Sequence, residues 1–173
     1  ATLLTTIATF GVVAQVYTAV AAGARPGLVL AEPFPGLPIA FEVEPLGMVF
    51  GLLASFLWIV TSIYAIGYMR GHHEENQTRF YLFFAISIGS ALGVAFAANM
   101  FTLFIFYAAL TLCTFPLVTH SGTDNAKRAG RVYLGLLIVP SIGFQLLAII
   151  WTWTLTGQLY FREAGVFACW LSA

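Results

Sequence analysis

Long apolar stretches separated by short polar segments run through most of the chain. Residues 101–120 carry no formal charge and are long enough for one helical crossing of a bilayer. A second apolar run, residues 79–98, comes just before it, so we expect two antiparallel spans joined by a tight turn at Asn99. In total the pattern predicts five membrane-spanning helices, at about residues 1–22, 45–69, 79–98, 101–120 and 131–156.

The segments between these spans are polar or rich in helix-breaking residues. Residues 23–44 contain four prolines and three glycines, and their short apolar pairs at 28–30 and 39–41 suggest a small β-hairpin on the membrane surface. Residues 164–173 are apolar again and are expected to form a partial helix. We therefore predict a single all-α integral membrane domain over residues 1–173, with a proline-rich loop or small hairpin outside the bundle.

The composition supports this class. The chain is 60% hydrophobic and only 8% charged, whereas soluble domains carry about 25% charged residues. A net charge of zero and the lack of a basic patch argue against a nucleic-acid partner. The two cysteines, Cys113 and Cys169, form neither a disulfide framework nor a metal-ligand pair by spacing. The first apolar run lacks a basic segment before it, so it does not look like a secretory signal.

The basic residues favour one orientation of the chain. Five of them flank one side of the predicted bundle and two the other, and the more basic side is expected to be cytoplasmic. This places the N-terminus in the cytoplasm and the loop 23–44 on the periplasmic or extracellular side. The first group is Arg70, Arg79, Lys127, Arg128 and Arg131, and the second is Arg25 and Arg162.

Two prolines fall inside predicted spans, and polar residues lie near each. A proline cannot donate to the helix ladder, and lipid cannot satisfy the carbonyl that it leaves free. Pro116 lies close to Thr111 and Thr114, and Pro140, which is expected to break its span, lies about 1.4 turns before Gln145. Such residues either pack helices together, the commoner use of threonine in membranes, or line a transport path.

The spans contain no interior Asp, Glu, Lys or Arg, although proton transfer through hydrocarbon normally uses buried ionisable groups. His120 is interpreted as an interfacial histidine that caps its helix. A metal site at residues 72–75 (HHEE) is not favoured, because adjacent side chains diverge and no third ligand is near. No nucleophile–base pair, phosphate loop or cofactor motif is present, so we expect no catalytic residue, metal or cofactor in this chain.

Several short segments occur in a distinctive order along nearly the whole chain: 41–47 (FEVEPLG), 63–70 (IYAIGYMR), 77–81 (QTRFY), 98–102 (ANMFT), 104–120 (FIFYAALTLCTFPLVTH), 126–134 (AKRAGRVYL) and 156–157. In this order they resemble the antiporter-like subunits shared by respiratory complex I and Mrp-type cation/proton antiporters, with the D-type component of Mrp antiporters as the closest likeness. The resemblance implies that the chain matches helices two to six of a bundle of about fourteen, built from two inverted repeats that each hold a half-channel.

The same resemblance assigns a special place to Ala108. The family motif around Tyr107 reads Phe-Tyr-Glu, and its proton-carrying glutamate falls on Ala108 here. Eight residues past Met100 place this position about 12 Å into the bilayer, where a methyl group cannot carry a proton. The chain departs from the family in two other ways. It has no counterpart of the family's lysine-bearing helix, broken helix and second repeat, and it has Val139–Pro140 where the family tends to have small residues.

Three origins remain open: a truncated divergent subunit, a fragment of a longer one, or a deliberately altered one. The resemblance favours a subunit of a proton-translocating complex, in the bacterial inner membrane, that is unable to carry protons alone. Its partners would be other membrane subunits, lipid, protons and Na+. The candidate path residues are Ala108, Thr111, Thr114, His120 and Gln145.

The first alternative is a structural subunit needed only for assembly, packing through the small residues Gly89, Gly93 and Ala97. The second is a small independent channel, which the lack of a selectivity element disfavours.

Overall fold

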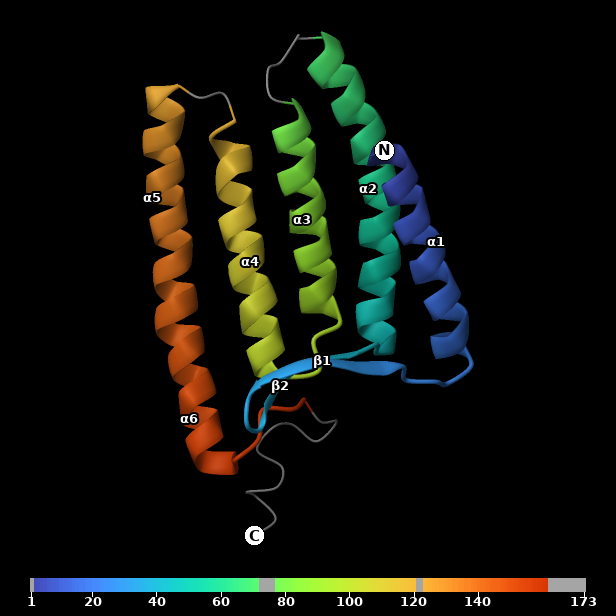
Figure 1. Ribbon diagram of the computed structural model, residues 1–173, viewed down its shortest axis with the longest axis vertical. Coiled ribbons are helices and arrows are strands. Elements are labelled where there is room, and N and C mark those ends of the chain that lie inside the picture. Colours follow the sequence, from blue (N-terminus) through green and yellow to red (C-terminus); the bar gives the residue numbers. More distant parts are fainter. Residues whose placement is uncertain (1, 72–76, 121–122, 162–173) are drawn as a thin grey trace.

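The computed structural model describes residues 2–71, 77–120 and 123–161 of the chain. Within these residues five helical runs are long and apolar enough to cross a membrane, which confirms the predicted class (Figure 1). The partial helix expected at 164–173 lies outside the described residues. The helices are α1 (Thr2–Ala21), α2 (Pro45–Gly71), α3 (Gln77–Ala95), α4 (Met100–Val118), α5 (Asp124–Pro140) and α6 (Leu146–Thr156), with a π-helical turn η1 (Ser141–Gln145) joining the last two.

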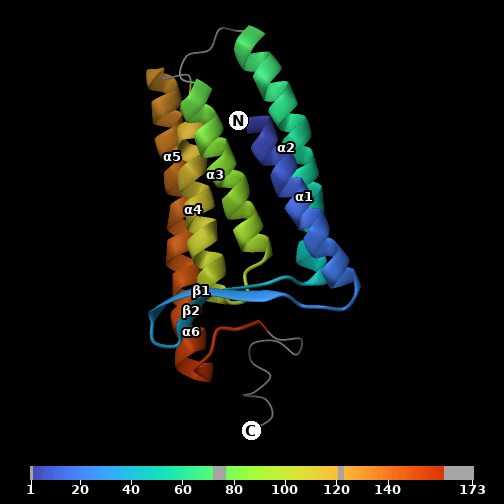
Figure 2. The ribbon, with the colours of Figure 1, turned by 45° about the vertical axis from the view of Figure 1, so that its right-hand side comes forward.

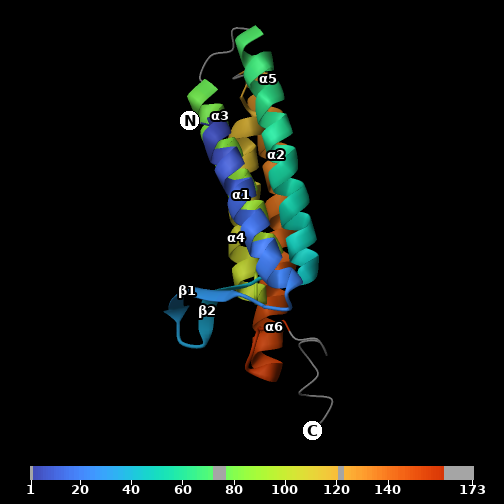
Figure 3. The same ribbon diagram turned by 90° about the vertical axis from the view of Figure 1, so that its right-hand side faces the viewer.

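The helices lie side by side in the order of the sequence. Each packs mainly against its neighbour in the chain, and α6 also touches α4 (Figure 1, Figure 2). Seen after a quarter turn, the helices form a narrow layer rather than a closed bundle (Figure 3). The described residues therefore leave both broad faces of the layer to be covered by lipid or by other helices.

Helix α2 packs through one regular seam. Its buried residues recur at alternating spacings of three and four, the pattern that keeps one stripe of a helix against its neighbours. The core of the contact with α1 is Val13, Val20 and Met48, and further along Phe10 lies 6.3 Å from Phe56 between ring centroids. The seam consists of Met48, Gly51, Ser55, Trp58, Ser62, Ala65 and Met69.

Helices α3 and α4 approach closely at a glycine. The ring of Phe106 on α4 lies against Gly93, where a Cβ atom would collide with it. Gly89, one turn earlier, has open space around its Cα, and Ala97 lies beyond the end of α3. Of these three positions, Gly93 is the one that the described residues cover with another helix, and Ala97 lies outside α3, so a packing face toward another subunit stays a prediction.

The β-hairpin suggested for the proline-rich loop is present. Strands β1 (Gly27–Phe34) and β2 (Leu37–Glu42) pair antiparallel, with Leu28 opposite Phe41. Gly36 at the turn has φ +81°, a left-handed conformation that favours glycine, and its N–H donates to Glu32 Oε1 at 2.8 Å. An added Cβ at Gly36 would also come within 2.8 Å of the Trp153 ring, so the hairpin tip rests on α6.

The hairpin is fixed to the α3–α4 turn by buried polar side chains. Asn99 Nδ2 donates to the Pro38 carbonyl at 2.8 Å, and Asn99 Oδ1 accepts from Thr102 N–H at 2.7 Å, which caps α4. Thr102 Oγ1 in turn accepts from Ala40 N–H at 3.0 Å. Asn99 and Thr102 are 1% and 0% exposed, so these bonds are shielded from water.

The backbone of the α3–α4 turn pairs with β2 and also with the segment that follows α6. Residues 96–99 hydrogen-bond to β2 on one side, through Glu42 N–H to Phe96 O at 2.9 Å. On the other side Met100 N–H donates to Leu159 O and Phe161 N–H to Ala98 O, both at 3.1 Å. Helix α3 therefore ends at Ala95, before the predicted end at 98, because the following backbone pairs with two strand-like segments instead.

We expect Asn99→Ala to lower the free energy of unfolding by about 1–3 kcal/mol, because it removes the α4 cap and the shorter of the two hydrogen bonds to the Pro38 carbonyl, which then keeps only the 3.5 Å bond from Thr102 Oγ1. The measurement is denaturant unfolding of the purified chain in micelles, followed by circular dichroism. Asn125→Ala, at an exposed position of α5, is the matched control and should change stability by less than about 0.5 kcal/mol. Equal effects of the two variants would contradict the assigned role of Asn99.

The glycine contact gives a second matched pair. Gly93→Ala should cost about 1–3 kcal/mol, because the new methyl group must displace the Phe106 ring. Gly89→Ala adds the same atoms to open space in the same helix and should be neutral or slightly stabilising. The same unfolding assay compares them, and a larger loss for Gly89→Ala would show that α3 and α4 do not pack as described.

Candidate functional site

A small, open hollow with partly polar walls lies between α4 and the α5–η1 segment. Its volume is about 320 Å³, and three of its lining side chains are polar, namely Tyr107, Ser141 and Gln145. Tyr107 lies seven residues into α4, or about 10 Å along its axis, so the hollow is at membrane depth. Apolar residues Leu136, Leu137 and Pro140 complete its walls.

The hollow coincides with a widened helical turn. Pro140 lacks an N–H donor, and the helix continues past it through the π-helical residues 141–145. Ser141 Oγ donates to the Leu137 carbonyl at 2.6 Å, which supplies a bond beside the proline. The predicted break at Pro140 is therefore wrong: the wide turn absorbs the missing donor, and Gln145 closes that turn beside α4.

Two of the threonines named as path residues bond within their own helix. Thr111 Oγ1 donates to the Tyr107 carbonyl at 3.0 Å, and Thr114 Oγ1 donates to the Thr111 carbonyl at 2.7 Å. This is the back-bonding typical of threonine in membrane helices. Their oxygens keep acceptor capacity, but their hydroxyl protons are already used.

The remaining candidates are spread along α4. Ala108 follows Tyr107 and is half-buried, close to the hollow in sequence and depth. Gln145 shares the hollow with Tyr107, so the structure brings these two elements together. His120 lies at the far end of α4, where its ring is 5.4 Å from that of Phe80 on α3. The sequence interpretation named Gln145 but missed Tyr107 and Ser141 as its neighbours.

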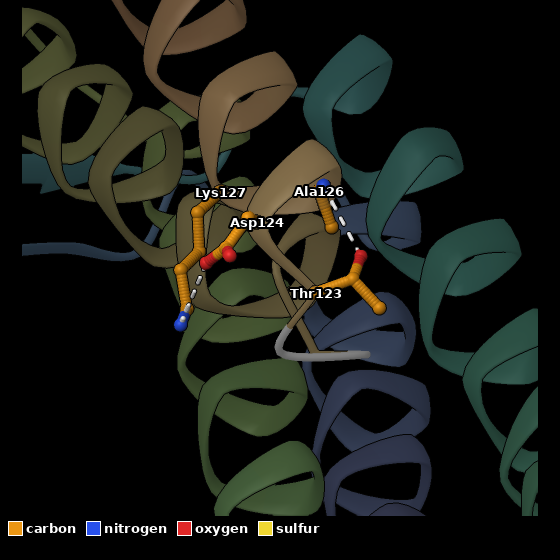
Figure 4. A network of polar contacts seen from close by, with 4 residues as sticks. All are labelled: Thr123, Asp124, Ala126 and Lys127. Carbon is orange, nitrogen blue, oxygen red and sulfur yellow. Dashed lines mark hydrogen bonds and ion pairs between the residues drawn. The ribbon is translucent and has the colours of Figure 1, made fainter.

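Helix α5 begins near the His120 end of the layer with a side-chain cap. Thr123 Oγ1 accepts from Ala126 N–H at 3.2 Å and so caps the helix (Figure 4). Lys127 Nζ lies 3.8 Å from Asp124 Oδ1, but both side chains are exposed, so this pair contributes little. The residues of the disfavoured metal site at 72–75 lie outside the described residues.

Two family models match the chain in succession. The model for the N-terminus of NADH-ubiquinone oxidoreductase (complex I) chain 5 matches residues 35–81. The model for the transmembrane region of NADH:quinone oxidoreductase and Mrp antiporters matches residues 97–171, which include α4, α5 and the hollow. The chain belongs to the antiporter-like subunit family of complex I and Mrp antiporters.

Curated relatives come from both branches of the family. NADH-quinone oxidoreductase subunit N of Desulforudis audaxviator (strain MP104C) is 25% identical over 132 residues, covering 76% of this chain and 26% of the relative. Chloroplastic NAD(P)H-quinone oxidoreductase subunit 5 of Adiantum capillus-veneris is 30% identical over 134 residues, covering 72% of this chain and 17% of the relative. The putative antiporter subunit mnhA2 of Staphylococcus haemolyticus (strain JCSC1435) is 23% identical over 99 residues, covering 57% of this chain and 12% of the relative.

A solved structure shares the fold. The membrane-bound sulfane sulfur reductase, an archaeal respiratory membrane complex, contains a chain that matches with a TM-score of 0.75 at 16% identity. The match covers 92% of this chain and 32% of that one. The chain thus spans about a quarter or less of the length of the curated relatives it matches, and about a third of the matched structure.

Thiol labelling can test whether the hollow holds water. In a background with Cys113→Ala and Cys169→Ala, we expect Gln145→Cys to react with a water-soluble thiol reagent about tenfold faster than Phe144→Cys, because only a hydrated thiol ionises. Phe144 is the adjacent residue and is 78% exposed on the outer surface of the helix, where lipid would surround it. Equal or slower reaction at 145 would mean that the hollow is dry.

Proposed function

We propose that this chain is a subunit, or part of a subunit, of a multi-subunit proton-translocating membrane complex of the complex I or Mrp type. The observation that carries the proposal is the family match across α4 and α5, where the polar hollow also lies. Since the chain covers only part of its relatives' length, the activity of a whole subunit is not carried over to it.

The chemistry of the hollow suits a passive share in such a path. Tyr107 and Gln145 can each donate and accept hydrogen bonds, and Ser141, whose proton is given to the Leu137 carbonyl, can still accept, so together they can hold water at membrane depth. They are neutral, and the resemblance places the family's glutamate at Ala108, which has no titratable group. Relay of a proton across hydrocarbon needs ionisable groups, so we propose that a neighbouring helix or subunit supplies them.

The shape of the layer is compatible with that division of roles. The described helices contact mainly their neighbours in sequence, so both faces of α4 are accessible to a helix from elsewhere in the assembly. Ala108 is half-buried rather than enclosed by α3 and α5. A neighbour could therefore bring a carboxylate or an ammonium group to this level, and Thr111, Thr114 and His120 would flank the path as acceptors or at its mouth.

The alternative is a purely structural role in assembly. A subunit whose spans carry no charged residues could serve packing alone. Gly93, which is covered by Phe106, shows that part of the small-residue pattern serves packing within the chain. The polar lining of the hollow favours the transport role, because Tyr107 and Gln145 place hydrogen-bonding groups at membrane depth. The relatives described above, an oxidoreductase subunit and a putative antiporter subunit among them, favour it as well.

For location and partners, we propose the bacterial inner membrane, with other membrane subunits and lipid as neighbours and protons and Na+ as the ions. The basic residues Arg70, Arg79 and Lys127 lie at the end of the layer opposite the hairpin (Figure 1). The positive-inside rule then puts that end and the N-terminus toward the cytoplasm, and the hairpin in the periplasm or outside the cell.

Restoring the acid tests the proposal. In the assembled complex, reconstituted in vesicles, we expect Ala108→Glu to change proton flux severalfold, because it places a titratable group beside the hollow. Ala109→Glu is the matched control, since it sits at nearly the same depth but about 100° around the helix, and should leave flux unchanged. Each variant carries an insertion cost of about 3 kcal/mol, so subunit content must be equalised before fluxes are compared.

The outcomes separate the two roles. A change confined to Ala108→Glu supports a path along this face of α4. Unchanged flux in both variants, with normal assembly, would favour the structural role instead.

A further inference from the structure

A second and larger concavity lies at the hairpin end of the layer. Its volume is about 630 Å³, and its walls come from the first turns of α2, the last turns of α3 and part of α4. Small residues, Gly47, Ala91 and Ala95, line it, and the larger apolar side chains around them include Phe50 and Leu53. The concavity is thus an apolar groove that opens sideways from a membrane-spanning layer.

The depth of the groove matches one leaflet. On α2 it extends from Leu46 to Leu53, about 10 Å along the helix, and on α4 it reaches Leu110, about 15 Å from the start of that helix. Half of a hydrocarbon core of about 30 Å is about 15 Å. A helix from another subunit would need a seam along most of α2, which is about 40 Å long, so an acyl chain is the better fit.

The mouth of the groove is acidic. Glu42, at the end of β2, and Glu44, just before α2, both line it, and among the described residues the lining includes no lysine, arginine or histidine. These carboxylates lie at the hairpin end of α2, at the level where lipid headgroups meet the helix ends. An anionic headgroup would be repelled there, whereas an ammonium group would meet two acceptors.

We propose that this groove binds an acyl chain of a phospholipid whose headgroup carries a primary ammonium group, with Glu42 and Glu44 contacting the ammonium. The apolar walls bind the chain and the two carboxylates select the headgroup. This site is separate from the hollow between α4 and α5, and its test measures lipid retention without any ion flux.

The experiment is native mass spectrometry of the full chain in mild detergent, titrated with phosphatidylethanolamine, phosphatidylcholine and phosphatidylglycerol of identical acyl chains. We expect phosphatidylethanolamine to be retained about three- to fivefold more than phosphatidylcholine, because one or two exposed ion pairs between its ammonium group and the carboxylates have about this effect on binding. Phosphatidylglycerol should be retained least. The double variant Glu42→Gln, Glu44→Gln should erase the preference. Asp124→Asn, an exposed acid at the opposite end of the layer, is the control and should keep it.

A second variant tests the chain-binding part. Ala91→Phe fills the groove without changing its charge, so it should reduce retention of all three lipids severalfold. If a variant fails to fold, photolabelling of the unaltered chain decides instead: phosphatidylethanolamine with a diazirine in its acyl chain should label peptides of residues 46–53 and 91–95 above all others.

Three results would overturn the proposal. They are equal retention of the three lipids by the unaltered chain, photolabel spread evenly over the outer faces of the helices, and a cross-link from a photoreactive residue at position 53 to protein. In the last case the occupant would be residues 162–173, whose chain continues from the groove-lining Phe161, or a helix of another subunit.

Discussion

The hydrogen bonds of Asn99 and Thr102 satisfy backbone groups at the hairpin end of the layer that lipid could not satisfy, and they join the segments that carry those groups. Most of the chain is apolar helix, and each helix packs against the next one in sequence. The hairpin, the α3–α4 turn and the segment after α6 are different, because their backbones carry polar groups that a helix does not satisfy. Two small side chains, buried at 1% and 0% exposure, satisfy several of these groups at once and join residues about 60 positions apart.

This polar junction also positions the two concavities. It fixes the start of α4, and therefore the level of Tyr107 and Ala108 in the membrane. It also sets β2 against residues 96–98, which brings Glu42 to the mouth of the apolar groove. The neutral hollow lies between α4 and the α5–η1 segment, and the groove is walled by α2, α3 and α4. One end of the layer therefore determines the geometry of both.

The sequence predicts the spans well because a membrane helix is specified by one local property, a long run of apolar residues. The fifth span begins at Asp124 rather than at 131, because a capped, polar helical segment precedes its apolar part and hydropathy alone does not detect it. The end of α3 and the pairing around Asn99 depend on partners far away in the sequence. That Tyr107, Ser141 and Gln145 line one hollow depends on the π-helical turn, which shifts the residues that face α4, so a regular helix gives the wrong face.

The ordering of the helices has a consequence for how the chain is made. Since each span contacts the one synthesised just before it, neighbouring helices can associate pairwise as they enter the bilayer, with little loop-closure entropy. Besides the hairpin contacts, the bonds from Leu159 and Phe161 to residues 98–100 depart from this order, because they cannot form until the last described helix has been inserted. The backbone pairing at the hairpin end of the layer is therefore complete only after the polypeptide has crossed the membrane for the fifth time. These two bonds mark the completion of folding for this part of the chain.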